Sequence, residues 1–416
     1  MKRIKVPYKQ EFITVEIPDK HLADVLEPNE VTIPEVTPHQ MVLDSLMNPS
    51  VPPNFNDFLQ LPGKLLIIVN DGTRPTPTRI VLEALKDYLV TTNVEFIVAT
   101  GVHRGPTFNE YQYIFGDMYD LFANRIHVHD ARIQEELHYI GTSRAGTELW
   151  LNNLVVHAEK ILVIGSVEPH YFAGYTGGRK AFLPGTAGYI SIEQNHKLAL
   201  SPNAKALALE GNPVHEDMMD ALKLFTHPIF SIMTVLNKDQ EIHGVFSGSL
   251  DGSFYAAIDC ANSIFVADIQ EKVDVVVTAS KYPMDVDLYQ AQKAIDNAKL
   301  ALKNGGTMIL VASCREGIGE EAFLRLLSQS DTPQAVLHAI EAGYKLGYHK
   351  AAKMAEVFQW ATVQAITDLD DALLESIFIQ PVHNLQDAID HALEVYGKDC
   401  KVLFLLDGAV TVPRIR

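Results

Sequence analysis

Two patterns of apolar and polar positions alternate along the chain and predict a succession of strands and helices. Short apolar runs without helical periodicity, typical of buried strands, occur at residues 65–69, 94–99, 161–164, 273–278, 307–312 and 402–406. Segments with helical periodicity follow several of these runs after a polar loop, at residues 79–89 and 287–303 among others. Strand, loop and helix in this order predict an α/β protein with mainly parallel sheets flanked by helices.

Other segments show a pattern of their own. Residues 1–17 alternate polar and apolar side chains around a break at residues 8–10, which predicts an opening hairpin. We expect β-structure with a tight turn at 137–156 and a second hairpin at 228–246. Further helices are predicted at residues 37–46, 203–225, 252–264, 321–328, 332–342 and 385–396, and a further strand at 361–366.

The length of 416 residues predicts more than one domain. A second run of α/β units starts near residue 267, so we expect an N-terminal α/β domain at 1–266 and a C-terminal α/β domain at 267–416. The first would carry a glycine-rich loop, and the second would close an active-site cleft between the two; a return of the last strand to the N-terminal domain is an alternative. The polar clusters directly follow predicted strands. In parallel sheets, ligands bind at the edge formed by the carboxyl ends of the strands.

Composition and charge exclude several classes of partner. The net charge of −18 argues against nucleic acid and against an anionic membrane surface. Three scattered cysteines lack metal-binding spacing, which indicates reduced thiols in the cytosol. The basic N-terminus has no apolar segment after it, and no apolar run is long enough to span a membrane. We therefore expect a cytoplasmic protein with a small-molecule partner; its oligomeric state stays open.

Residues 161–196 contain the densest set of reactive side chains. After the strand at 161–164, six glycines allow sharp turns and a close approach of the backbone to a ligand. Among these glycines lie Glu168, His170, Arg179, Lys180 and His196. Such side chains can bind an anion, move a proton, attack a carbonyl or hold a metal. Long loops of this kind are usually functional, so we expect most of the site here.

Two further loops follow strands and carry polar side chains. The segment Asp71–Pro75, DGTRP, combines a hydroxyl with a guanidinium near a helix start and can bind a carboxylate or phosphate. It can equally be a capped turn in which Arg74 only pairs with Asp71. His103 alone would more often be structural, but with His170 it offers an acid/base on each face of a planar intermediate.

For the remaining candidate residues, the sequence alone is compatible with more than one chemical role. Lys180 can bind phosphate or act as an amine nucleophile. It does not belong to a Walker A motif, because Ala181 stands where a Ser or Thr is needed, and no strand is followed by GxGxxG. His196 alone cannot build a zinc site. Gln290 and Lys293 share one face of a helix, where they either bind an anion or are solvated.

Together these motifs resemble the nickel-pincer lactate racemase family. The resemblance spans nearly the whole chain and rests on DGTRP (71–75), TGVHR (100–104), EPHYFAGYTGGRK (168–180), LPG (183–185), NH (195–196) and YQAQK (289–293). It implies two α/β domains around a cleft. It also implies a nickel complex of pyridinium-3,5-bis-thiocarboxylic acid mononucleotide, the nickel-pincer nucleotide, which separate cofactor-synthesis enzymes supply.

The resemblance assigns a role to each candidate. Lys180 would be the covalent tether of the cofactor and His196 the nickel ligand, with the pincer's carbon and two sulfurs as the other ligands; soft sulfur donors suit nickel. His103 and His170 would be the acid/base pair while hydride moves from C2 of the substrate to the cofactor. The other roles concern binding: Arg74, Gln290 and Lys293 would hold the substrate carboxylate, and Asp71, Thr73, Gly177 and Gly178 the cofactor.

The function implied is racemisation or epimerisation of a 2-hydroxy acid, lactate or a related carboxylate, by an isomerase that uses reversible hydride transfer. One alternative is a non-catalytic protein that binds or senses the nickel-pincer nucleotide; retention of both His103 and His170 favours the enzyme. A second alternative is an NAD-dependent dehydrogenase, which the missing dinucleotide-binding glycines disfavour.

Overall fold

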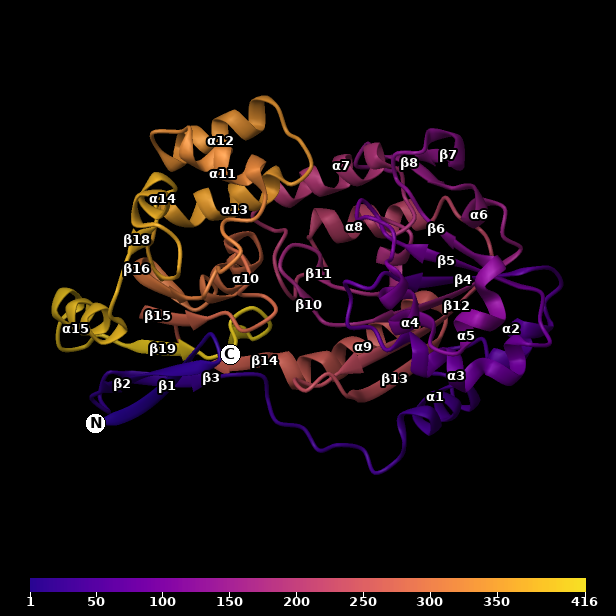
Figure 1. Cartoon of the computed structure of the whole chain (residues 1–416), viewed down its shortest axis with the longest axis horizontal. Helices are drawn as coiled ribbons and strands as arrows, with labels where there is room; N and C mark the ends of the chain where they lie inside the picture. The colour runs from indigo at the N-terminus through magenta and orange to yellow at the C-terminus, as the bar shows by residue number, and fades with distance from the viewer. The chain divides into compact units, whose positions relative to one another are not determined.

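The structure, a computed structural model, describes residues 1–416 and divides them into two compact units (Figure 1). One unit is Glu30–Ile264, and the other combines Met1–Asn29 with Phe265–Arg416. Each has a six-stranded sheet with flanking helices, which confirms the predicted α/β class. The division predicted from the sequence put residues 1–29 in the N-terminal domain. The structure groups them with the C-terminal half, because β3 (Leu22–Leu26) pairs with β19 (Val402–Leu405).

The sheet of the unit Glu30–Ile264 has the strand order β13-β12-β9-β4-β5-β6. Its strands are β4 (Leu65–Asn70), β5 (Val94–Ala99), β6 (Ile126–Val128), β9 (Lys160–Ser166), β12 (Ile229–Leu236) and β13 (Ile242–Gly248). All neighbours are parallel except β12 and β13, which form the predicted second hairpin. The central strands β4 and β9 are buried along almost their whole length, which explains their uninterrupted apolar sequence.

Helices cover this sheet and complete its core. One cluster of buried side chains joins the sheet to α1 (Pro38–Met47), α2 (Phe55–Gln60), α3 (Thr78–Leu89), α4 (Phe108–Phe115) and α5 (Met118–Phe122). The remaining elements are β7 (Leu137–Thr142), β8 (Glu148–Asn152), α6 (Asn153–Val156), β10 (Pro169–His170), β11 (Gly174–Tyr175), α7 (Tyr189–Lys197), α8 (Pro213–Leu222) and α9 (Leu250–Phe265). β7 and β8 are the antiparallel pair expected at 137–156.

The sheet of the other unit has the order β18-β17-β16-β15-β19-β3, with every pair of neighbours parallel. Its further strands are β15 (Val273–Ala279), β16 (Leu302–Val311), β17 (Thr362–Ile366) and β18 (Gln380–Pro381). The opening hairpin, β1 (Lys2–Tyr8) with β2 (Glu11–Ile17), shares a core with this sheet and α15 (Leu385–Tyr396).

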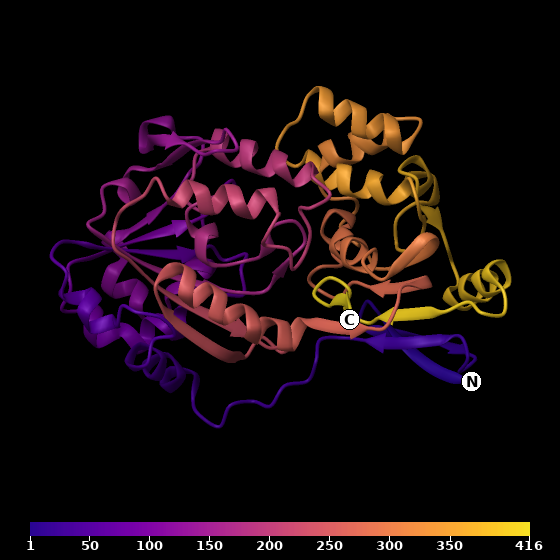
Figure 2. The ribbon, with the colours of Figure 1, turned by 180° about the vertical axis from the view of Figure 1, so that it is seen from behind.

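Four helices of this unit pack together beside the sheet. They are α10 (Leu288–Ala298), α11 (Glu321–Ser328), α12 (Pro333–Ala342) and α13 (Tyr348–Phe358); α14 (Asp371–Ser376) lies beside β18. Figures 1 and 2 show these four helices and the β1–β2 hairpin on opposite sides of the sheet. A short parallel pair, β14 (Val266–Ile269) with β20 (Val412–Ile415), completes the unit.

Two helices differ from the expectations of the sequence analysis. The helix predicted at 203–225 is reduced to α8, because Asn212 caps a helix that begins at Pro213, and residues 203–212 form turns. The helix expected to reach residue 303 ends at Ala298, since β16 already begins at Leu302. The strand predicted at 402–406 is β19, which lies between β15 and β3 in the sheet. No helix of the chain is long and apolar enough to cross a membrane.

Candidate active site

Three loops of the unit Glu30–Ile264 carry most of the predicted site residues. They follow β4, β5 and β9, which are neighbours in the sheet because β4 pairs with both of the others. Since all three strands are parallel, their carboxyl ends lie at one edge of the sheet. Residues 71–77, 100–107 and 167–188 therefore meet at that edge.

Asp71 and His103 join the first two loops. Asp71 is buried, and its Oδ1 accepts hydrogen bonds from the backbone N–H and the hydroxyl of Thr73. Its Oδ2 lies 2.8 Å from Nδ1 of His103. Burial alone would raise the pKa of Asp71, but the hydrogen bonds from His103 and Thr73 outweigh it and lower the pKa below its ordinary value. Asp71 is thus a carboxylate at neutral pH and orients the His103 ring.

The capped turn considered as an alternative requires an ion pair between Arg74 and Asp71, and the structure has no such pair. The backbone N–H of Arg74 donates to the carbonyl of Asp71, which closes the turn, but its half-buried guanidinium is in no ion pair. The charge of Arg74 also contributes to the lowered pKa of Lys180. Arg74 therefore offers a guanidinium that can bind a carboxylate of a ligand near Lys180.

His170 lies at the end of the short β10–β11 pair, in the third loop. Its Nδ1 accepts a hydrogen bond of 3.2 Å from the backbone N–H of Ala173. A neutral imidazole that accepts at Nδ1 carries its proton at Nε2. His103 has the opposite arrangement, because its Nδ1 donates to a carboxylate and leaves the lone pair at Nε2. The two histidines thus present different groups at Nε2, a lone pair in His103 and an N–H in His170.

Lys180 lies on a short 3₁₀ turn, residues Gly178–Ala181, and is half-buried with no ion pair. Burial lowers its pKa well below the ordinary value, and the charges of Arg179 and Arg74 lower it further. Its Nζ lies 5.5 Å from the centre of the Phe172 ring. A lowered pKa raises the fraction of the neutral amine, which is the nucleophilic form of a lysine.

Gly177 and Arg179 fix the shape of the loop that carries Lys180. Gly177 has φ 82°, and a Cβ there would lie 2.8 Å from the carbonyl oxygen of Ser166, so only glycine fits. Arg179 is fully buried and donates to the carbonyls of Ala173 and Gly177 at 2.7 and 3.2 Å. Burial lowers the pKa of Arg179 to about 9, which still leaves it charged at neutral pH. Arg179 therefore ties the loop together.

His196 lies in the last turn of α7. Its ring centre is 5.1 Å from that of Phe172, the ring that also lies under Lys180. Burial lowers the pKa of His196 to about 3, with a smaller contribution from the charge of Lys180. The imidazole is therefore neutral at physiological pH, which is the form that binds metals.

The donor atoms fit a metal that brings most of its own ligands. No group of three or more His, Cys, Asp or Glu side chains that could hold a metal ion occurs in the chain. A bare metal ion would need several such donors. One neutral imidazole beside a nucleophilic lysine amine instead suits a metal in an organic complex attached to that lysine. His196 and Lys180 thus fit the nickel-pincer nucleotide.

Gln290 and Lys293 lie in the other unit, on α10. Both are half-buried, and Asp287 caps the helix by accepting from the backbone N–H of Gln290 at 2.7 Å. Nζ of Lys293 lies 3.2 Å from Sδ of Met284. Their spacing on one helical face agrees with the predicted geometry.

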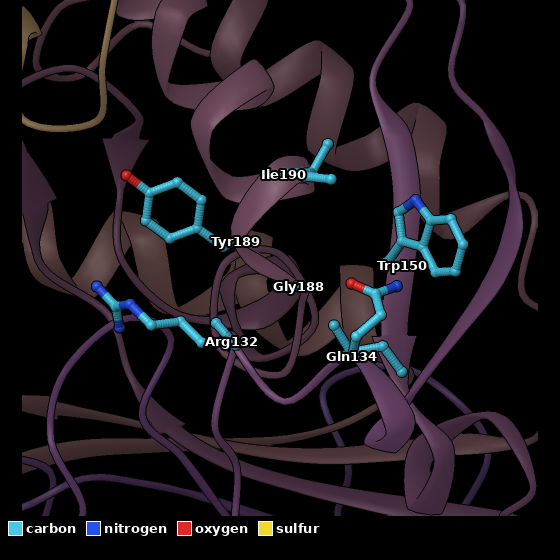
Figure 3. A pocket seen from close by; sticks show the side chains of 8 residues that line it. Arg132, Gln134, Trp150, Gly188, Tyr189 and Ile190 are labelled. Atoms are coloured by element: carbon cyan, nitrogen blue, oxygen red, sulfur yellow. The ribbon is translucent and has the colours of Figure 1, made fainter.

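A surface pocket of about 360 Å³ also lies in the unit Glu30–Ile264, and it contains none of the predicted site residues. Figure 3 shows Arg132 and Tyr189 on one side and Trp150 on the other. The Arg132 guanidinium is 5.3 Å from the centre of the Tyr189 ring. The backbone N–H groups of Gly188 and Tyr189 at the start of α7 already donate to Trp150 and Ala131 at 2.8 Å. These contacts anchor the helix that carries His196.

Comparisons with known proteins identify relatives of the whole chain. Residues 8–207 match the family described as the lactate racemase N-terminal domain, and residues 268–412 match the lactate racemase C-terminal domain. Lactate racemase from Thermoanaerobacterium thermosaccharolyticum is 30% identical over 428 residues, which cover 100% of both chains. Lactate racemase from Lactiplantibacillus plantarum is 29% identical over 421 residues, with 98% of this chain and 99% of the relative covered.

Solved structures extend the comparison to the fold. The lactate racemase apoprotein from T. thermosaccharolyticum matches with a TM-score of 0.90 at 29% identity, over 99% of this chain and 100% of that chain. A protein from Thermotoga maritima matches with a TM-score of 0.67 at 16% identity, over 91% and 98% of the two chains, and shares the fold alone. The fold and the family comparisons define a two-domain α/β isomerase. The chain belongs to the lactate racemase family, as its motifs indicated.

Proposed function

We propose that this chain racemises lactate or a closely related 2-hydroxy acid, with a nickel-pincer nucleotide attached to Lys180. The names of the relatives support lactate. The observation that carries the proposal is the arrangement of Lys180 and His196 around the Phe172 ring, which brings an amine with a lowered pKa and a neutral imidazole to one half-buried place. Lys180 would form the covalent bond and His196 would bind the nickel. When bound, the cofactor supplies an acceptor for the hydride on C2 of the substrate.

His103 and His170 would move the substrate's hydroxyl proton. The hydrogen bond from Nδ1 of His103 to Asp71 leaves a lone pair at Nε2, so His103 would be the base in the resting enzyme. The hydrogen bond that Nδ1 of His170 accepts from Ala173 leaves an N–H at Nε2, so His170 would be the donor. Hydride loss from C2 flattens the substrate, and its return to the opposite face inverts the configuration.

Asp71 would act on the substrate through His103. Both of its carboxylate oxygens already accept hydrogen bonds from the protein, Oδ1 from Thr73 and Oδ2 from His103. We therefore propose Asp71 as a positioning residue for His103, in place of the role in cofactor binding that the resemblance implied. Thr73 would complete this turn, and its exposed side chain remains a proposed contact of the cofactor.

The remaining residues would bind rather than react. Arg74, Gln290 and Lys293 would hold the substrate carboxylate, since a guanidinium and an ammonium bind carboxylates strongly. Gly177 and Gly178 would shape the loop under the cofactor; both have positive φ. Separate cofactor-synthesis enzymes would supply the nucleotide.

A non-catalytic protein that binds or senses the cofactor is the second candidate. It would need Lys180 and His196 but no proton-transfer groups. The hydrogen bond between Asp71 and His103 supports the enzyme, because a carrier gains nothing from an oriented base beside its ligand.

The test is a racemisation assay on the full chain co-expressed with the cofactor-synthesis enzymes. Enantiopure 2-hydroxy acids, lactate first, are incubated with the protein and resolved by chiral chromatography. We expect either enantiomer to give a mixture of both, Lys180→Ala to abolish the conversion, and Lys197→Ala, which changes an exposed lysine beside His196, to retain it. A chain that carries the cofactor and converts none of the acids would be a carrier.

A further inference from the structure

Helix α8 carries a buried carboxyl group that joins three segments of its unit. Asp217 is only 2% exposed. Its Oδ1 accepts a hydrogen bond from the hydroxyl of Ser143, and its Oδ2 accepts from the hydroxyl of Thr147 and from Nδ2 of Asn195, both at 2.8 Å. Ser143 and Thr147 lie in the turn between β7 and β8, and Asn195 lies on α7. Asp217 therefore holds both this turn and α7 on α8.

The orientation of the Asn195 amide follows from its acceptors. Its Nδ2 donates to Oδ2 of Asp217 at 2.8 Å and to the carbonyl of Val214 at 3.3 Å. Both acceptors are oxygen atoms, so the amide nitrogen must face them. Asn195 is fully buried, and its Oδ1 has no hydrogen-bond partner within the protein. A buried oxygen without a partner costs free energy, which favours a role of Asn195 in placing α7 over a role in stabilising the core.

The next residue along α7 is the proposed nickel ligand. His196 follows Asn195 in the last turn of the helix, and its ring centre lies 5.1 Å from that of Phe172. Neighbouring helix positions point about 100° apart, so Asn195 faces α8 while His196 faces Phe172. Because a helix moves as a rigid rod, the contact between Asn195 and Asp217 sets the position of the imidazole.

Helix α8 also holds the segment on the other side of this contact. Asn212, the N-cap residue of α8, donates from Nδ2 to the carbonyl of Phe172 at 2.9 Å. Nζ of Lys180 lies 5.5 Å from the centre of the Phe172 ring. One helix therefore supports both groups that the proposed function brings together, His196 through Asp217 and the surroundings of Lys180 through Asn212.

A second carboxyl group on α8 supports the turn alone. Asp220 lies one turn after Asp217 and accepts from the backbone N–H and from Nε of Arg144, at 2.6 and 2.8 Å. Arg144 belongs to the same turn between β7 and β8. The other ion-pair partner of Asp220 is Lys223, which also lies outside α7. Asp220 thus separates support of the turn from support of α7.

We propose that Asp217 is a positioning residue for His196 and acts through Asn195. The proposal rests on the proposed function, in which His196 binds the nickel. Asp217 would contact neither the substrate nor the cofactor. Loss of a group that orients a metal ligand usually costs about 10–100-fold in metal affinity or activity, so the nickel should be held less firmly when the contact between Asp217 and Asn195 is broken.

The test measures how fast nickel leaves the full chain after co-expression with the cofactor-synthesis enzymes. Variants with equal amounts of the Lys180 adduct, counted by intact mass, are incubated with EDTA, and elemental analysis gives the nickel that remains. We expect Asp217→Ala and Asn195→Ala each to lose nickel about tenfold faster than the parent chain. The double variant should lose it no faster than either single variant, because both changes break the same contact.

Asp220→Ala is the matched control, since it weakens the same turn and should release nickel at the parent rate. A role of Asp217 in the fold alone would lower the free energy of unfolding and leave nickel release at equal adduct unchanged. If Asp217→Ala does not fold, Asn195→Ala decides, because it keeps the hydrogen bonds of Asp217 to the turn. Nickel release at the parent rate in Asn195→Ala, or effects that multiply in the double variant, would overturn the proposal.

Hydrogen exchange separates this proposal from failure of the proposed function. It is measured on the full chain expressed without the cofactor-synthesis enzymes. The start of α7 is held separately, because the hydroxyl of Ser191 donates to the carbonyl of Glu148 at 2.6 Å. We expect the amides at the end of α7 to exchange about tenfold faster in Asp217→Ala and Asn195→Ala, and those at its start to exchange at the parent rate.

The two measurements fail independently. A parent chain that gains no adduct on co-expression would end the proposed function, while faster exchange at the end of α7 would still support Asp217 as the residue that holds this helix. Unchanged exchange at the end of α7 in both variants would overturn the role of Asp217, whether or not the chain carries the cofactor.

Discussion

Nδ1 of His103 lies 2.8 Å from Oδ2 of Asp71, although the two residues are 32 positions apart in the sequence. They follow β4 and β5, which are parallel neighbours, so the sheet itself brings them together. The pair fixes the proton of His103 at Nδ1 and leaves a lone pair at Nε2.

Replacement of Asp71 by Asn should impair the base without unfolding the protein. An amide at this position can donate to Nδ1 of His103 and favour the tautomer whose Nε2 cannot accept a proton. We expect kcat to fall by about 100-fold with little change in KM. Steady-state racemisation kinetics measure both, and the exposed Asp130→Asn is the control. An unchanged kcat would remove Asp71 from the proposed role.

The same pair gives the protein a defined response to acid. Hydrogen bonds from His103 and Thr73 hold the pKa of Asp71 below its ordinary value in the folded chain. A carboxyl group whose folded pKa is lowered contributes stability above its unfolded pKa of about 3.9, and this is lost as pH falls through the folded value. The difference in unfolding free energy between the parent and Asp71→Asn should therefore shrink on acidification below about pH 4. Urea unfolding at a series of pH values measures it; a difference that grows on acidification would contradict the assigned shift.

The two histidines should be needed for turnover but not for attachment of the cofactor. We expect His103→Ala and His170→Ala each to lower the racemisation rate by about 10²–10⁴-fold, the usual contribution of an acid or base. Intact mass should show the same adduct as in the parent chain. His138→Ala, at an exposed position, is the matched control and should keep full activity. Loss of the adduct in either variant would mean that the histidine serves binding instead.

Gly177 should tolerate no side chain. An added Cβ would lie 2.8 Å from the carbonyl oxygen of Ser166, and φ 82° is already unfavourable for other residues. Gly211 has φ 73° but open space around it, so Gly211→Ala isolates the backbone cost. We expect Gly177→Ala to lower the free energy of unfolding by about 2–3 kcal/mol and Gly211→Ala by about 1–2 kcal/mol. Chemical denaturation measures both free energies of unfolding. Equal losses in Gly177→Ala and Gly211→Ala would contradict the prediction, because they would mean that the contact with Ser166 relaxes.

Much of the fold is predictable because buried parallel strands have an unmistakable apolar sequence. The runs that became β4, β5 and β9 were identified in this way, and the polar loops after them were rightly placed at one sheet edge. β3 was missed because its five residues are too few to show a period, and its pairing with β19 is non-local.

Motifs in the sequence name the candidate site residues, whose roles remain predictions, but they do not give the contacts between these residues. Motif order pointed to His103, His170, Lys180 and His196, but no spacing in the sequence predicts that Asp71 meets His103.

The central claim is that Lys180 forms the covalent bond to the cofactor. The low pKa of Lys180 supports a reactive amine, and Lys180→Arg keeps a long cationic side chain that cannot form the same bond. The decisive measurement is the intact mass of the chain co-expressed with the cofactor-synthesis enzymes, before and after this substitution. We expect an added mass on the parent chain, localised to Lys180 by peptide mapping, and none on Lys180→Arg. An unmodified parent chain that racemises lactate, or an adduct that persists in Lys180→Arg, would contradict the claim.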